Sequence, residues 1–149
     1  MCNGGTAVAA ELSLLGHEVT LIKTSNAMHD KNFNFLLKNG GEVNLIENGK
    51  TVTAKIKHIT RELSHVSKSE VVIIYIQTTY HKKLIKRIRP YLRDGQILLL
   101  NPGYLSTAYV LKHCSDIDLI ICEAQSSFLD CRIIEPGTIR IGFRNVRNP

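Results

Sequence analysis

The chain has 149 residues, of which 44% are hydrophobic and 21% are charged, a composition typical of one globular domain. Its apolar runs are far shorter than the ~20 residues that cross a bilayer, so we predict no membrane partner. Without a visible secretory signal we expect a cytoplasmic location. The formal net charge of +6 suits an anionic ligand without identifying one.

The first half of the chain alternates helix and strand signals. Strong helix formers over 6–15 end at a glycine, and β-branched residues then alternate over 17–23, which predicts a helix and a strand. Apolar spacing over 26–39 predicts a second helix. An Asn48–Gly49 turn within the alternating segment 43–59 indicates a β-hairpin.

The second half continues this alternation. The run over 70–77 is apolar without interruption, as in strands covered on both faces, and we expect it to be central. Pro90 should end the helix predicted over 80–93 before its last residues. The elements predicted here are strands over 70–77, 96–100, 118–123, 131–134 and 138–143 and helices over 80–93 and 105–112. We therefore predict an α/β fold with a doubly wound, mostly parallel sheet and a hairpin insertion.

Polar residues follow each apolar run. In doubly wound sheets the ligand crevice lies outside the carboxyl ends of the strands, so these residues are the candidates for a site. They include Lys23, Thr24, Gln77, Thr78, Asn101, Pro102, Gly103 and Glu123, together with His81, which leads the following helix.

Residues 1–7 look like the latter half of a G-x-G-x-x-G dinucleotide fingerprint that runs into the first helix, with Gly5 as its third glycine. Cys2 takes the place of the second glycine, where its Cβ would crowd a pyrophosphate. The first glycine and the strand before it do not occur. We therefore expect a sheet without its usual first strand.

The residues that follow the first predicted strand bear on the choice of cofactor. About twenty residues beyond the motif, an NAD site would show Asp or Glu for the ribose hydroxyls. Lys23 and Thr24 stand there instead. A cation and a hydroxyl suit a 2′-phosphate, which favours NADP over NAD. The alternative is that Lys23 is only a solvated residue at the end of a strand.

Several segments together match one known pattern. They are residues 3–7, 14–21, 81, 94–97, 101–103, 123–126 and 131–132. In this order they resemble the opine (octopine/nopaline) dehydrogenases, in the N-terminal NAD(P)-binding domain. The resemblance implies a Rossmann-like fold and a reductive condensation, in which an amino acid and a 2-oxo acid form an imine that receives hydride from a nicotinamide cofactor.

The resemblance also implies where the cofactor lies. From pyrophosphate to nicotinamide, the implied residues are Asn3, Gly4, Gly5 and Thr6 at the helix N-terminus, then Gln77, Thr78 and His81, then Asn101, Pro102, Gly103 and Glu123. Members of this family carry a second, helical domain with the acid–base histidine. Because this sequence stops at Pro149, we expect a truncated domain, with no catalytic residue of its own, that does not turn over substrate alone.

Other functions stay open. The chain could instead be a relative of another two-domain nicotinamide dehydrogenase, such as a ketopantoate reductase or glycerol-3-phosphate dehydrogenase. These enzymes have the same kind of fold, although residues 123–132 fit the opine group better. A non-catalytic nucleotide-binding or interaction module, dimeric through an open sheet edge, is a further alternative. The basic residues over 81–89 fit a solvated helix face, so no nucleic acid is expected. The scattered histidines predict no metal site.

Overall fold

The computed structural model describes residues 3–25 and 30–145, which divide into two compact units. The first unit combines residues up to Arg61 with residues from Phe128 onward, and the second runs from Glu62 to Ser127. Helices and parallel strand pairs occur in both units, which confirms the predicted α/β class. Within the described ranges, no helix has the length and apolar character to cross a membrane.

The helices and strands follow the predicted order, with some shifts in their ends. They are α1 (Asn3–Leu14), β1 (Thr20–Ile22), α2 (Asp30–Lys38), β2 (Glu42–Glu47), β3 (Lys50–Lys55), β4 (His58–Thr60), β5 (Val71–Ile74), α3 (His81–Ile88), β6 (Ile97–Leu100), α4 (Thr107–His113), β7 (Ile120–Glu123), β8 (Leu129–Glu135) and β9 (Thr138–Arg144). Short 3₁₀ turns occupy Leu63–Lys68, Thr78–Tyr80 and Arg89–Tyr91.

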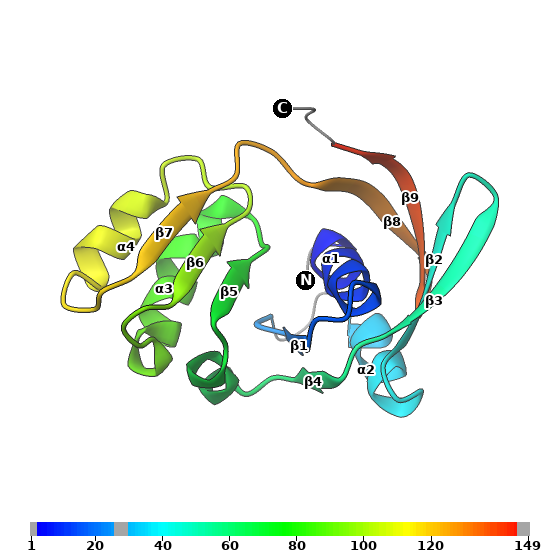
Figure 1. Ribbon diagram of the computed structural model, residues 1–149, viewed down its shortest axis with the longest axis horizontal. Coiled ribbons are helices and arrows are strands. Elements are labelled where there is room, and N and C mark those ends of the chain that lie inside the picture. The colour runs from blue at the N-terminus through cyan, green and yellow to red at the C-terminus, as the bar shows by residue number, and fades with distance from the viewer. Residues whose placement is uncertain (1–2, 26–29, 146–149) are drawn as a thin grey trace. The chain divides into compact units, whose positions relative to one another are not determined.

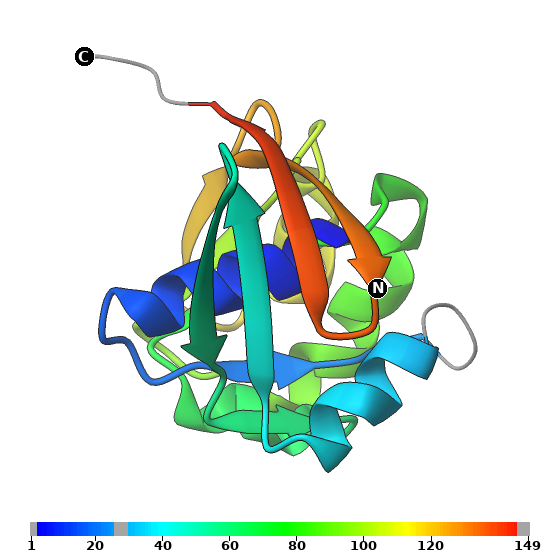
Figure 2. The ribbon, with the colours of Figure 1, turned by 90° about the vertical axis from the view of Figure 1, so that its right-hand side faces the viewer.

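In the first unit, α1 lies against a four-stranded sheet of order β3–β2–β9–β8 (Figure 2). The predicted hairpin is present, because β2 and β3 pair antiparallel around Asn48 and Gly49, both with positive φ as a type I′ turn requires. The antiparallel pair β8–β9 joins it through parallel pairing of β2 with β9. The hairpin is thus half of a mixed sheet rather than an isolated insertion.

The helix α1 begins at Asn3, before the predicted start at Thr6. Glycine is a poor helix former, yet Gly4 is buried and Ala7 and Ala10 are fully buried along the same helix. Small residues allow the helix to approach its sheet closely. Tertiary packing therefore outweighs the local propensity in the first turn.

An arginine of β9 links the helix and the sheet of the first unit. The Arg144 guanidinium contacts the Glu47 carboxylate through Nε at 2.9 Å and the Glu11 carboxylate through Nη2 at 2.6 Å. The hydrogen bonds that Arg144 donates to these carboxylates, with Glu11 as the larger cause, raise the pKa of Arg144. These ion pairs therefore link β9 to β2 and to α1.

The first unit also contains a short parallel pair, β1 with β4, in which Thr20 lies opposite His58 and Ile22 opposite Thr60. Parallel strands end at the same edge of their sheet. Lys23 and Arg61, which follow the two strands directly, therefore come together at one carboxyl edge. The predicted strand over 17–23 contributes only three paired residues.

In the second unit, β5, β6 and β7 form a parallel sheet with α3 and α4 packed against each other (Figure 1). The middle strand is β6, so the prediction that the run over 70–77 is central is wrong for the described strands. A continuous apolar run indicates burial of both faces, not the number of neighbouring strands. The helix α3 ends at Ile88, ahead of Pro90 as predicted.

The described strands form three sheets, not the single doubly wound sheet predicted. The last two strands follow β7 in sequence but do not extend its parallel sheet. They pair with the hairpin instead, through β9 and β2. The sheet order therefore follows long-range pairing that local sequence patterns do not encode.

Candidate functional site

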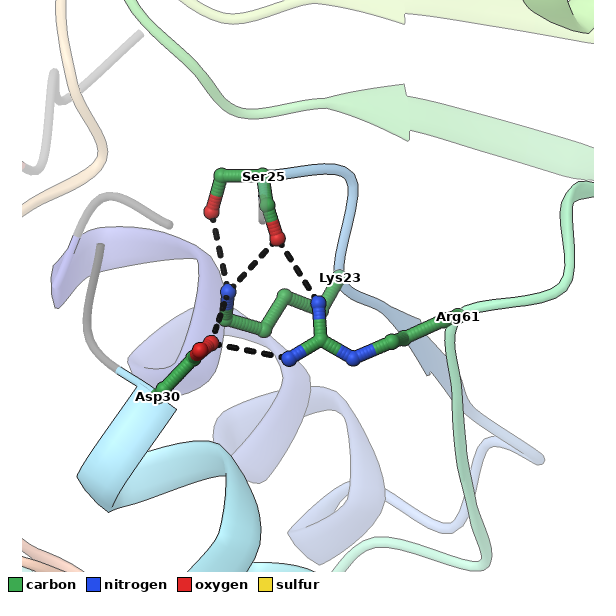
Figure 3. A network of polar contacts seen from close by, with 4 residues as sticks. All are labelled: Lys23, Ser25, Asp30 and Arg61. Atoms are coloured by element: carbon green, nitrogen blue, oxygen red, sulfur yellow. Dashed lines mark hydrogen bonds and ion pairs between the residues drawn. The ribbon is translucent and has the colours of Figure 1, made fainter. Parts of the chain in front are cut away.

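The ammonium of Lys23 is buried, with a side-chain exposure of 0%. Nζ donates to the carbonyl oxygen of Ser25 at 2.7 Å and to its Oγ at 3.0 Å, and it lies 2.6 Å from Oδ1 of Asp30 (Figure 3). These contacts take up every N–H of an ammonium, which has three. Lys23 is therefore neither the free cation nor the solvated residue considered from sequence.

A second cation, Arg61, contacts the same two residues as Lys23. The Arg61 guanidinium donates through Nη1 to the carbonyl oxygen of Ser25 and through Nη2 to Oδ1 of Asp30, both at 2.8 Å. It also lies over the Phe33 ring, 4.7 Å from the centroid. Hydrogen bonds from Lys23, and then from Arg61, lower the pKa of Asp30, which is therefore ionised. We call Lys23, Ser25, Asp30 and Arg61 the Lys23 network.

Sequence reasoning singled out Lys23 but not Asp30 or Arg61 of this network. Asp30 begins α2, and Arg61 follows β4, which was expected to be part of the hairpin. The signal that would have found Arg61 is the parallel pairing of β1 with β4, because it places the residues after both strands side by side. Local periodicity does not reveal that pairing.

The other predicted site residues of the first unit lie at the start of α1 and after β1. Gly4 and Thr6 are buried, Gly5 and Thr24 are half-buried, and Asn3 is the first residue of α1. The first backbone N–H groups of a helix have no partners within the helix and favour an anion. Their role in holding a pyrophosphate stays a prediction.

In the second unit His81 is fully buried at the start of α3. Nε2 lies 3.2 Å from the carbonyl oxygen of Ile76, which only accepts hydrogen bonds, so Nε2 carries the proton. Nδ1 then accepts from the Ser106 hydroxyl at 2.8 Å. Burial lowers the pKa of His81, which favours this neutral form. His81 thus joins the end of β5 to the loop after β6 through Ser106, which sequence reasoning missed.

The neutral His81 predicts acid sensitivity. The unfolded chain binds a proton near pH 6.5, whereas the native imidazole binds it only at lower pH, so stability falls as pH decreases through this window. Relative to His81→Gln, we expect the unaltered chain to lose its stability advantage below about pH 6.5. Urea unfolding of both chains between neutral and acidic pH measures this. A stability difference that does not change with pH contradicts the prediction.

The amide of Asn101 is the most unusual group near the end of β6. Its side chain is fully buried, and neither Oδ1 nor Nδ2 has a hydrogen-bond partner among the described residues. Leaving a buried polar group unpaired costs about 1–3 kcal/mol. An amide kept in such a place is expected where a ligand can pair with it.

Glu123 ends β7 and holds the loop that follows Asn101. Its carboxylate accepts hydrogen bonds from the backbone N–H of Leu105 at 3.0 Å and from the N–H and hydroxyl of Thr107 at 2.5 and 2.7 Å. Burial acts to raise the pKa of Glu123, but these hydrogen bonds outweigh it and lower the pKa. An ionised carboxylate at the start of α4 is favoured by the helix dipole.

The loop itself is tightly constrained. Tyr104 and Leu105 both have positive φ, a conformation that costs energy in residues other than glycine. A Cβ added to Gly103 would lie 2.6 Å from the Glu123 side chain, so Gly103 allows the close approach of the loop to β7. Pro102 is half-buried between Asn101 and this glycine.

The structure therefore brings several predicted residues together at the carboxyl end of the parallel sheet. Gln77 is exposed and Thr78 half-buried after β5, next to the helix that His81 begins. The strand-end cluster, as we call it, consists of Gln77, Thr78, His81, Asn101, Pro102, Gly103, Ser106 and Glu123. Asn3 to Thr6, Lys23 and Thr24 belong to the other unit.

Comparisons with known proteins agree with this fold. Curated relatives include an opine dehydrogenase from Arthrobacter sp. (strain 1C), 27% identical over 93% of this chain and 39% of its own length. The chain thus spans about two fifths of that relative. Among solved structures, octopine dehydrogenase with NADH and pyruvate matches at a TM-score of 0.77 and 17% identity, over 95% of this chain and 38% of that one.

A ketopantoate reductase of the PanE/ApbA family from Ralstonia eutropha JMP134 also matches, at a TM-score of 0.67 and 18% identity, over 95% of this chain and 42% of that one. At these identities the structures show a shared Rossmann-like fold. The family model for ketopantoate reductase PanE/ApbA matches residues 4–126, most of the chain. The chain therefore belongs to the ketopantoate reductase PanE/ApbA family.

Proposed function

We propose that this chain binds a nicotinamide dinucleotide as the cofactor domain of an opine dehydrogenase-like oxidoreductase. Family membership and the fold of octopine dehydrogenase, whose structures contain NADH with pyruvate, L-arginine or agmatine, support the proposal. The observation that carries it is the unpaired amide of Asn101, at the carboxyl end of a parallel sheet where dinucleotides bind.

The residues present fit such a cofactor. The Asn101 amide offers a donor and an acceptor in a buried place, and a nicotinamide carboxamide carries the complementary pair. Glu123 and His81 fix the loop that presents this amide, because they hold Leu105 and Ser106. The bound cofactor supplies the hydride, while these residues bind and orient it.

Reductive condensation of an amino acid with a 2-oxo acid is the proposed reaction of the whole enzyme. Reduction of a 2-oxo acid alone, as in ketopantoate reductases, is the second candidate, favoured by the family match. Oxidation of NADH by a 2-oxo acid distinguishes them in an enzyme that contains this chain. The condensation needs an added amino acid, whereas the simple reduction proceeds without one.

Two buried amides of the second unit provide a matched test of cofactor binding. Unlike Asn101, Gln96 is satisfied: Nε2 donates to the carbonyl oxygens of Val66 and Ser69, and Oε1 accepts from the N–H of Arg93. We expect Asn101→Ala to weaken cofactor binding at least tenfold with little loss of stability. We expect Gln96→Ala to lose about 1–3 kcal/mol of stability, and the folded variant to bind the cofactor as tightly as the unaltered chain does.

Titration with NADH and NADPH, followed by nicotinamide fluorescence or calorimetry, measures the affinities, and urea unfolding measures stability. Saturable binding that Asn101→Ala weakens supports the proposal. Absence of binding of either cofactor at millimolar concentration refutes it. Equal affinity of the Asn101→Ala variant and the unaltered chain shows that the amide has no part in binding.

The sequence favoured NADP because of the cation at Lys23. That ammonium has no N–H left for a phosphate, since Ser25 and Asp30 take all of its hydrogen bonds. Within the Lys23 network, Arg61 is the exposed cation that would be left to bind a 2′-phosphate.

A further inference from the structure

We infer that Asn48 is a site of spontaneous deamidation, in which the backbone nitrogen of Gly49 attacks the side-chain amide carbon of Asn48. The new carbon–nitrogen bond closes a succinimide ring, and the amide nitrogen takes up the backbone proton and leaves as ammonia. Water then opens the ring at either carbonyl, which gives aspartate or isoaspartate at this position. The reaction consumes one water molecule and changes no oxidation state.

The chain contains three Asn–Gly pairs, and glycine hinders this attack least because it has no Cβ. They are Asn3–Gly4, Asn39–Gly40 and Asn48–Gly49. In the first pair, Gly4 is buried at the start of α1, which withdraws its nitrogen from the base that must remove its proton. The other two pairs lie in turns, and the contacts of the asparagine amide distinguish them.

Asn48 and Gly49 form the exposed turn of the β2–β3 hairpin (Figure 2). The ladder ends at the pair of Glu47 with Lys50, so neither turn residue takes part in it. Within residues 3–25 and 30–145, neither the amide of Asn48 nor the N–H of Gly49 has a hydrogen-bond partner. The described contacts therefore contain no hydrogen bond that must break before the ring closes.

This turn also lies beyond the best supported part of its sheet. The strand β3 is at the edge of the sheet, and β9 pairs with β2 over Asn44 to Ile46, before the turn. Exposed ends of this kind open locally at a much smaller free-energy cost than global unfolding. The rotation that brings the amide carbon of Asn48 to the nitrogen of Gly49 therefore does not require the unit to unfold.

Asn39–Gly40 is the matched comparison within the same unit. Gly40 has a φ of +72° and Gly49 a φ of +75°, and nothing lies within 4 Å of a Cβ added to either. The amide of Asn39, however, is held at both ends. Its Nδ2 donates to the carbonyl oxygen of Glu42 at 2.9 Å, and its Oδ1 accepts from the N–H of Gly41 at 3.2 Å. Both hydrogen bonds oppose the rotation that ring closure needs, so the reaction is slower here.

Peptide mapping by mass spectrometry tests this order of reactivity. The folded chain is incubated at mildly alkaline pH, and the replacement of each amide by an acid is followed over time. We expect Asn48 to convert at least tenfold faster than Asn39 and Asn3. In guanidinium, which removes the structure, the three rates should agree within a few-fold. Equal rates in the folded chain, or the same preference for Asn48 in the unfolded chain, overturn the inference.

A pair of matched substitutions assigns the fast reaction to its residue. Asn48→Gln lengthens the side chain, so the attack would have to close a larger ring, and the fast conversion should disappear while the rate at Asn39 stays the same. Asn44→Gln is the control, because Asn44 lies in the same strand but precedes a leucine. This variant should keep the fast conversion at Asn48. A fast conversion that persists in Asn48→Gln overturns the inference.

The two products should differ in their effect on the hairpin. Aspartate keeps the two-residue turn, since Asp–Gly suits a type I′ turn as Asn–Gly does, so Asn48→Asp should unfold at nearly the same urea concentration as the unaltered chain. Isoaspartate carries the backbone through the side chain and adds one atom to the turn, which then no longer matches the β2–β3 register. The isoaspartate form, separated by chromatography, should unfold at lower urea than Asn48→Asp. Equal unfolding of the two contradicts this consequence.

Discussion

Asp30→Ala is expected to lower the free energy of unfolding by about 3 kcal/mol, because removal of one partner leaves a buried charge unpaired. Lys23 has a side-chain exposure of 0%, and among residues 3–25 and 30–145 it keeps the two oxygens of Ser25 as partners in this variant. The ammonium would also remain close to the Arg61 guanidinium without the carboxylate between them. Both effects act against the native state.

Lys23→Met should cost much less, although it breaks the same ion pair. Methionine fills a similar volume without a buried charge, and Asp30 keeps both Arg61 and contact with water. Removing one partner of an ion pair is costly when the other charge is left buried and unpaired, and Asp30 does not incur that cost, because it is partly exposed and keeps Arg61. Urea unfolding of the two variants measures this asymmetry. Equal losses would show that the pair acts symmetrically and that burial of Lys23 does not set its cost.

An exposed ion pair of the same length shows how much stability is lost when no buried charge is left unpaired. Arg89 and Asp116 lie 2.6 Å apart with both side chains partly exposed. Pairs of this kind contribute roughly 0–1 kcal/mol. We therefore expect Asp116→Ala to change stability by less than about a third of the loss in Asp30→Ala.

Gly41→Ala should be the most damaging small substitution in the chain's first unit, with a loss above about 3 kcal/mol. Gly41 has a φ of +85°, and an added Cβ would lie 2.2 Å from the carbonyl oxygen of Ile56. The backbone cannot move away easily, because the N–H of Ile56 donates to the carbonyl oxygen of Gly41 at 2.9 Å. Thermal or urea unfolding measures the loss.

The neighbouring glycine separates the two causes. Gly40 has a φ of +72°, but nothing lies within 4 Å of an added Cβ. Gly40→Ala therefore reports the backbone conformation alone, at roughly 1–2 kcal/mol. If Gly41→Ala is no worse than Gly40→Ala, the collision with Ile56 does not contribute.

Much of the local structure follows from local sequence. The Asn48–Gly49 turn, the end of α3 before Pro90 and the parallel strands around Leu98 are all predicted by residue type and spacing. The pairing of β2 with β9 and of β1 with β4 is not, because each joins segments far apart in the chain. Which strands pair over such distances depends on tertiary packing, and the local periodicity of apolar residues does not reveal it.

The candidate site shows the same division. The rule that ligands meet the carboxyl ends of parallel strands singled out His81, Asn101 and Glu123, which all lie at that end of the sheet of the second unit, while their part in binding stays a prediction. It did not reveal Asp30, which reaches the edge from a helix. Nor did it reveal the burial of Lys23, since lysine at a strand end is usually exposed.

The pairing of β2 with β9 has a consequence for synthesis of the chain. The first unit needs strands on both sides of residues 62–127 in sequence, so its four-stranded sheet cannot close until β9 has left the ribosome. The second unit is contiguous and all of its strands emerge earlier. Of the two units, the first is therefore completed later, because its four-stranded sheet depends on long-range strand pairing, which is slow.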